Sequence, residues 1–134
     1  MVLGGAVGLY GMFEYGDSRP SDLEIQLNAI ATEGNSELPM MLDADTRLDS
    51  MTVRSEDTFE YEYTLINLQT SEINRDAFEQ AMATHLTTFV CQSNFNEVFR
   101  ANGVKVVYTY YGSDGGQVAS VGIPTSECAT ATSA

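Results

Sequence analysis

The chain has 134 residues, and its 19 acidic against 6 basic side chains give a net charge of −13. That balance argues against a nucleic acid or an anionic lipid surface as partner, because both are bound mainly through lysine and arginine. With 43% hydrophobic residues the chain can build the core of one domain. One histidine and two cysteines leave few ligands for a zinc centre.

The first 13 residues carry no charge and are mostly apolar. As a helix they would span about 18 Å, too little to cross a hydrocarbon core of about 30 Å. Three interpretations stay open: the outer part of a signal-anchor, an element that packs on a partner, or a short core element. We predict residues 1–13 to be a truncated membrane anchor or docking element. The side chains that would make this contact are Val2, Leu3, Val7, Leu9, Tyr10, Met12 and Phe13.

Residues 14–37 are predicted to form a linker and a short helix. The stretch 14–21 is polar and rich in turn-forming residues. Ser21 is a suitable N-cap, and Glu24 three residues later completes a capping box. We therefore expect a helix from about Asp22 to Thr32.

Two strands are predicted next, over about 46–53 and 58–68, with a turn between them at 55–57. The second strand alternates strictly, which is typical of a half-buried antiparallel strand with one wet face. Its polar face is expected to point into water. The apolar face carries Phe59, Tyr61, Tyr63 and Leu65, and the polar face carries Glu60, Glu62 and Thr64.

The strongest helical period lies between about Arg75 and Val90, after a possible N-cap at Asn74. A second short helix is predicted over 94–101, ended by Gly103. The apolar stripe of the first helix is predicted to cover the tyrosine-bearing face of the sheet. Its members are Phe78, Met82, His85 or Leu86, and Phe89.

Two further strands are predicted over 104–111 and 117–123, joined by a glycine-rich hairpin loop at 112–116. The predicted fold class is α+β, with an antiparallel sheet of about four strands in ββ-αα-ββ order. Helices cover this sheet, and an N-terminal helix precedes it. The α+β domain is placed at 38–128, and 129–134 is predicted to be a flexible tail.

No group of side chains predicts catalysis or metal binding. Asp43, Asp45 and Asp49 lie close in sequence but lack the other ligands of an EF-hand, and Arg47 is expected to pair with a nearby carboxylate. The strand glutamates are expected in water, and His85, the lone histidine, has no nucleophile motif beside it. We therefore predict a protein that is not an enzyme and needs no cofactor.

The two cysteines, Cys91 and Cys128, allow only one intramolecular bridge. If they form it, the protein works in an oxidising compartment. The alternative is a pair of unrelated buried thiols in a cytosolic protein.

Several motifs occur together in an order that resembles a group of small, uncharacterised bacterial envelope proteins. In that group a signal-anchor precedes the folded domain. The resemblance implies an extracytoplasmic α+β domain with a Cys91–Cys128 disulfide, and it implies no activity. The motifs are Leu38-Pro39-Met40 followed by Asp43, Thr46 and Leu48, then Tyr61-x-Tyr63, Cys91, and Gly103-Val104 leading to Tyr108-x-Tyr110, Gly115 and Cys128.

Three hypotheses for function follow. The first is a non-enzymatic periplasmic or extracytoplasmic domain that acts by protein–protein contact, tethered to the inner membrane or docked through residues 1–13. It would be an accessory subunit of a membrane or secretion assembly, with no nucleic acid or small molecule as partner. The second is a small acidic inhibitor or immunity-type protein that binds a basic partner. The third is a small hydrolase or ligand carrier that uses the tyrosine-lined sheet.

Overall fold

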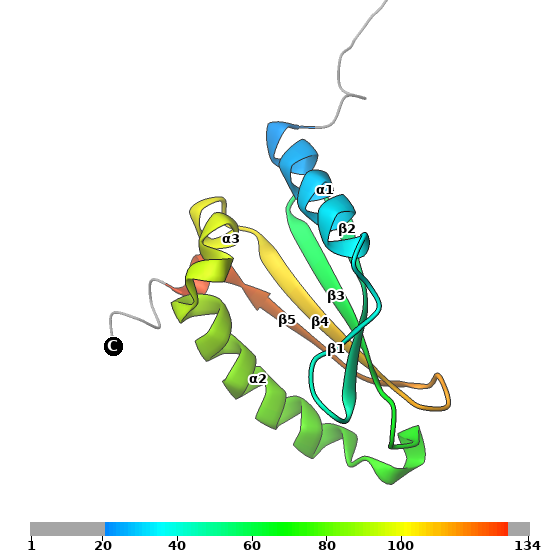
Figure 1. The fold of residues 1–134 in the computed structure, drawn as a ribbon. Helices are drawn as coiled ribbons and strands as arrows, with labels where there is room; N and C mark the ends of the chain where they lie inside the picture. Colours follow the sequence, from blue (N-terminus) through cyan, green and yellow to red (C-terminus); the bar gives the residue numbers. More distant parts are fainter. Residues whose placement is uncertain (1–20, 129–134) are drawn as a thin grey trace, which may run out of the picture.

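The computed structural model describes residues 21–128, and it shows one twisted sheet with its helices packed on a single face (Figure 1). We call this the covered face and the opposite one the outer face. The elements follow in the order α1 (Asp22–Asn35), β1 (Met40–Met41), β2 (Thr46–Ser55), β3 (Thr58–Leu65), η2 (Thr70–Glu72), α2 (Arg75–Gln92), η3 (Asn94–Asn96), α3 (Glu97–Ala101), β4 (Lys105–Gly112), β5 (Gln117–Pro124) and η4 (Thr125–Glu127).

Both long helices begin at the predicted caps. The hydroxyl of Ser21 accepts the N–H of Glu24 at 3.0 Å, and the side chain of Asn74 accepts the N–H of Ala77 at 3.0 Å. Each bond satisfies a backbone donor that has no partner within the helix. The short α3 ends before Gly103, whose φ of 65° suits the position after a helix.

The sheet contains five strands in the order β1-β2-β3-β4-β5. The structure confirms the predicted α+β class, with helices covering one sheet and a helix preceding it, but one central pairing of the predicted antiparallel sheet is parallel. Strands β2 and β3 are antiparallel, as are β4 and β5, but β3 and β4 are parallel. The chain crosses the sheet through α2 and α3 before β4 begins, and such a crossover lets two strands run in the same direction. The added strand β1 is too short to show any periodicity.

The core lies on the covered face, where the predicted aromatic residues of β3 and β4 are buried together. Leu27 and Ala31 of α1 belong to this same core. The predicted domain begins at residue 38, whereas the packed unit includes α1. The largest fully buried side chains are Tyr108, Phe59, Phe99, Leu27, Val90, Val104, Val106 and Val118.

Two side chains lie where the sequence did not place them. The sequence predicts Phe89 in the core stripe of α2, but it is 43% exposed, and the buried residues of this part of the helix are Leu86 and Val90. Glu60 was expected in water, but only 3% of it is exposed. It sits on a central strand, where side chains of the two neighbouring strands cover it.

Polar partners on the outer face compensate the buried carboxylate of Glu60. Arg54 of β2 forms an ion pair with it, and Thr109 of β4 donates its hydroxyl to it at 2.5 Å. The hydrogen bond with Glu60 raises the pKa of Arg54. A buried charge needs such partners, because an unpaired one is strongly destabilising.

A disulfide joins the end of α2 to the segment that follows β5. Cys91 and Cys128 are bridged with an S–S distance of 2.09 Å and a Cα–Cα distance of 5.2 Å. This is the pairing that the resemblance implies. The bridge ties the crossover helix to the C-terminal edge of the sheet.

Removing the bridge is expected to cost about 3–4 kcal/mol of unfolding free energy, because the closed loop restricts the unfolded chain. The measurement is urea unfolding of the wild-type protein and of a Cys91→Ala/Cys128→Ala variant. Reductant should lower the stability of the wild type and leave the variant unchanged. Equal stability of the oxidised wild type and the variant would contradict this account.

Replacing Glu60 with alanine is expected to destabilise the fold by about 1–3 kcal/mol, because the buried Thr109 hydroxyl loses its charged acceptor and keeps only the Ser120 hydroxyl within reach. Glu56→Ala removes the same charge from the exposed β2–β3 turn and should change stability by less than about 0.5 kcal/mol. Chemical denaturation of both variants compares the two positions. A similar small loss in both would show that Glu60 contributes no more than a surface acid.

Candidate functional site

Four tyrosines of β3 and β4 form a stack on the covered face. The parallel register pairs Tyr61 with Tyr108 and Tyr63 with Tyr110. The ring centroids of these two pairs lie 5.3 Å and 4.8 Å apart, with nearly parallel planes. Phe78 of α2 meets Tyr110 edge-on at 5.1 Å. Aromatic pairs at these separations stabilise the packing beyond simple burial, so the stack is a rigid floor.

An apolar groove of about 330 Å³ lies over this floor, between α2 and the segment that joins β1 to β2. We call it the tyrosine groove. In Figure 1, α1 lies beside β2 and α2 runs along the β5 side. The groove is lined by Leu42, Asp43, Thr46, Tyr63, Leu65, Phe78, Met82, His85, Leu86, Phe89, Tyr108 and Tyr110.

Exposed apolar side chains stand on both sides of the tyrosine groove. Leu42 on one side is 52% exposed, and Phe89 on the other is 43% exposed. Met40 and Met41, immediately before Leu42, are 43% and 45% exposed. Single exposed apolar residues are ordinary, but several beside one apolar hollow mark a surface that binds something.

A second apolar hollow of about 270 Å³ continues the covered face toward α1. Tyr61 lines it, together with Ile30 of α1 and Met51 of β2. Met40 also lines this hollow, while Leu42, two residues further on, lines the tyrosine groove. Met40 of β1 and Leu42, which follows β1, therefore present apolar side chains to the two hollows.

The tyrosines hold their protons firmly. Burial raises the pKa of Tyr110 to about 12, and it raises the pKa values of Tyr61, Tyr63 and Tyr108 still further. Each therefore remains a hydrogen-bond donor at physiological pH. Tyr108 lines the groove, and its hydroxyl is buried without a partner among residues 21–128. A bound molecule with an acceptor group would satisfy it.

The mouth of the groove carries a fixed negative charge at Asp43. Its carboxylate accepts the N–H groups of Asp45 and Thr46, both at 2.8 Å. The hydrogen bond from Asp45 is the main reason that the pKa of Asp43 is lowered. On the outer face, Arg47 pairs with Asp49 at 2.5 Å, as predicted, and Asp49 also accepts the hydroxyl of Thr64.

The structure separates the acid and base candidates that the sequence offered. His85 lines the tyrosine groove on the covered face, whereas Glu60 and Glu62 lie on the outer face. Within residues 21–128 no group of three or more histidine, cysteine or acidic side chains is placed to hold a metal ion. The arrangement is suited to binding an apolar segment that carries a hydrogen-bond acceptor.

Sequence reasoning placed the tyrosines and the wall of α2 correctly but missed the opposite wall. Met40, Met41 and Leu42 lie in a segment to which we assigned no role. Three consecutive apolar residues before Asp43 are the sequence signal that indicates this wall. The predicted docking segment at residues 1–13 lies outside the described residues.

Raised tyrosine pKa values predict a loss of stability in alkali. Below about pH 10 the tyrosines are protonated in both states; above it the unfolded chain releases protons that the folded state retains. The free energy of unfolding should therefore fall as the pH rises from about 10 toward the raised folded values. Urea unfolding across this range measures the slope. Tyr110→Phe, which keeps the ring, should have a shallower slope, and an identical slope would contradict the assignment.

Comparison with known proteins adds a family and a shared fold. A pilotin of the type 2 secretion system of Vibrio vulnificus, EpsS, has a TM-score of 0.61 at 13% identity, over 79% of this chain and 91% of that one. The type II secretion system pilotin AspS of Vibrio cholerae has a TM-score of 0.59 at 18% identity, over 80% and 93%. A Pseudomonas aeruginosa protein described as secreted has a TM-score of 0.66 at 16% identity, over 80% and 93%.

At these identities the likeness concerns the fold alone. No curated protein matches the sequence. None of the helices in residues 21–128 combines the length and the hydropathy needed to cross a bilayer. The model of a family described as a domain of unknown function, DUF8479, matches residues 23–119, which run from α1 into β5. The chain therefore belongs to the DUF8479 family.

Proposed function

We propose that this protein is a non-enzymatic, extracytoplasmic accessory subunit of a secretion assembly, and that it binds a segment of a protein partner in the tyrosine groove. The observation that carries the proposal is the groove itself. It is apolar, it is flanked by exposed Leu42 and Phe89, and it is lined by Tyr108, whose buried hydroxyl has no partner among residues 21–128. The fold shared with two pilotins of type II secretion systems supports the kind of assembly.

An amphipathic helix is the occupant that fits these walls best. Such helices commonly place their apolar face in a hydrophobic groove, with anchors one turn apart. The floor and walls supply aromatic and methionine side chains, and Tyr108 supplies a donor for one polar group of the helix. Asp43 at the mouth and the net charge of −13 favour basic residues beside that apolar face.

The disulfide supports the location. A bridge such as Cys91–Cys128 persists in the periplasm or outside the cell and is rare in the cytosol. Tethering to the inner membrane through residues 1–13 belongs to the same proposal. The alternative of an acidic inhibitor that covers a basic active site stays a prediction.

A photo-crosslinking amino acid at Leu42 or Phe89, introduced in the native host, tests the proposal. We expect crosslinks from both positions to one envelope protein of a secretion assembly, because these side chains stand on opposite sides of the groove. Ile25 is the matched control, since it is an apolar residue on α1 that is 55% exposed and does not line the groove. A crosslinker there should capture no such protein.

Phe89→Asp should abolish the crosslink from Leu42 and leave the unfolding midpoint nearly unchanged, because Phe89 contributes little to the core. Capture of cytosolic proteins, or equal capture from Ile25, would contradict the proposal. If the Leu42 crosslink persists in the Phe89→Asp variant, the partner does not bind in the tyrosine groove.

A further inference from the structure

The outer edge of the sheet at β5 carries backbone groups that no strand of residues 21–128 pairs with. Strand β5 is last in the order, and its other edge pairs with β4. Thr125 donates its N–H to the carbonyl of Val104 at 3.2 Å. In an antiparallel pair of strands, residues whose backbone groups bond across the pair alternate with residues whose backbone groups do not. The N–H and C=O groups of the residues two, four and six positions before Thr125 therefore bond to β4, and those of the residues between them point away from β4. The N–H and C=O groups of Ser120 and Gly122 therefore face outward.

The opposite edge of the sheet is protected by contrast. There β1 pairs with Arg47 and Leu48 of β2. Further along, the side chain of Asn35 bonds both to the N–H and to the carbonyl of Met51, each at 2.8 Å. Proteins usually block strand edges in such ways, because an open edge is a template for another strand.

At β5 the protection reaches only one residue. Arg75 of α2 donates to the carbonyl of Val118 at 3.2 Å. In the rest of the strand, the outward groups at Ser120 and Gly122 have no partner of this kind in the described part of the chain.

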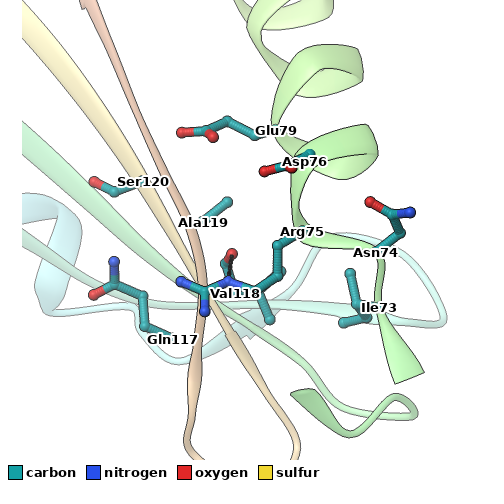
Figure 2. A pocket seen from close by; sticks show the side chains of 9 residues that line it. All are labelled: Ile73, Asn74, Arg75, Asp76, Glu79, Gln117, Val118, Ala119 and Ser120. Atoms are coloured by element: carbon teal, nitrogen blue, oxygen red, sulfur yellow. Dashed lines mark hydrogen bonds between the residues drawn. The ribbon is translucent and has the colours of Figure 1, made fainter. Parts of the chain in front are cut away.

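Two hollows lie along this edge beside α2. The larger, of about 600 Å³, is bounded by Gln117–Ser120 on the strand and by the first turns of α2. Figure 2 shows Glu79 projecting from α2 toward β5, while Gln117 and the guanidinium of Arg75 lie beside the strand. The smaller, of about 160 Å³, lies beside Gly122–Pro124 and includes Glu127. A strand added to β5 would have space at both ends.

Charge indicates the occupant. Asp76 and Glu79 line the larger hollow and Glu127 lines the smaller. Of the positive side chains, Arg75 is engaged with the strand carbonyl, and Lys105 lies over Gly122 on the outer face, away from α2. A second copy paired through β5 would bring the same acids together across a two-fold axis, in a chain of net charge −13. Residues 1–13 of this chain carry no charge that these acids would attract. A segment rich in lysine or arginine is the complementary partner.

We propose that the outer edge of β5 binds an extended basic segment of a partner protein, which adds to the sheet as a further strand. Its backbone bonds to Ser120 and Gly122. Its alternate side chains, which all point to one side of a strand, are basic and reach Glu79 and Glu127. This site is separate from the tyrosine groove, so either proposal can fail without the other.

The probe is a short synthetic peptide in which lysine alternates with threonine, added to the whole oxidised protein. Amide hydrogen exchange, followed by NMR, should slow at least about tenfold at Ser120 and Gly122, which corresponds to about 1.4 kcal/mol. Amides on the β2 edge should not change. A matched peptide with N-methyl groups on the bonding amides should give no protection, and one with glutamate in place of lysine should not bind.

Two pairs of variants separate the backbone contribution from the charge contribution. Ser120→Pro removes the outward N–H and should abolish protection at Gly122, whereas Ser120→Ala keeps that N–H and should behave like the wild type. Glu79→Lys should weaken peptide binding several-fold, whereas Glu56→Lys makes the same charge change in the distant β2–β3 turn and should not. The unfolding midpoint of each variant shows whether it is folded.

Several outcomes would overturn the proposal. Equal protection by the N-methylated peptide would mean that no strand is added. Equal binding of the glutamate peptide would mean that the acids of α2 do not select the ligand. Slow exchange at Ser120 without peptide, increasing with protein concentration, would assign the edge to a second copy. If the lysine peptide does not slow amide exchange at Ser120 and Gly122 in the folded wild-type protein, β5 does not bind such a segment.

Discussion

Parallel pairing of β3 with β4 requires the chain to return across the sheet, and α2 makes that return. The pairing sets the register that places Tyr61 beside Tyr108 and Tyr63 beside Tyr110. It also places β5 at the outer edge, because β4 already has β3 on its other side. The aromatic floor, the wall of the groove and the open edge therefore all depend on this one pairing.

Helix α2 is attached to the β5 side of the sheet near both of its ends. At the first turn, Arg75 bonds to the carbonyl of Val118. Near the last turn, Cys91 is bridged to Cys128, just after η4. Both attachments lie toward β5, whereas α1 packs over β2. The floor over β3 and β4 is covered from two sides and left open between them, which is the physical origin of the tyrosine groove.

Features that depend on neighbours in sequence could be predicted, and features that depend on neighbours in space could not. The caps at Ser21 and Asn74 and the apolar face of β3 follow from local sequence, and the structure confirms them. The direction of β4 relative to β3 leaves no trace in the periodicity of either strand. Burial of Glu60 likewise arises from Arg54 and Thr109, which belong to other strands.

In the candidate site too, features set by neighbours in sequence could be predicted and features set by neighbours in space could not. Tyrosines at alternate positions predict an aromatic floor, and the helical period predicts a covering helix. Phe89 was placed inward because it continues the stripe begun by Phe78. The helix instead turns Leu86 and Val90 to the core and leaves Phe89 beside the groove. An apolar helical stripe that contains more residues than the core can bury therefore indicates a binding surface, because the residue left unburied lies at the boundary with solvent.

The two binding surfaces proposed here lie on opposite sides of α2. Met82, His85 and Phe89 line the tyrosine groove, while Asp76 and Glu79 line the hollow beside β5. The first surface is mainly apolar and acts chiefly through buried area, which salt affects little, with a smaller contribution from the charge of Asp43. The second is acidic and exposed, so its attraction for a basic segment weakens as ions screen it. Because the two depend on different forces, their contributions to one partner are separable by ionic strength.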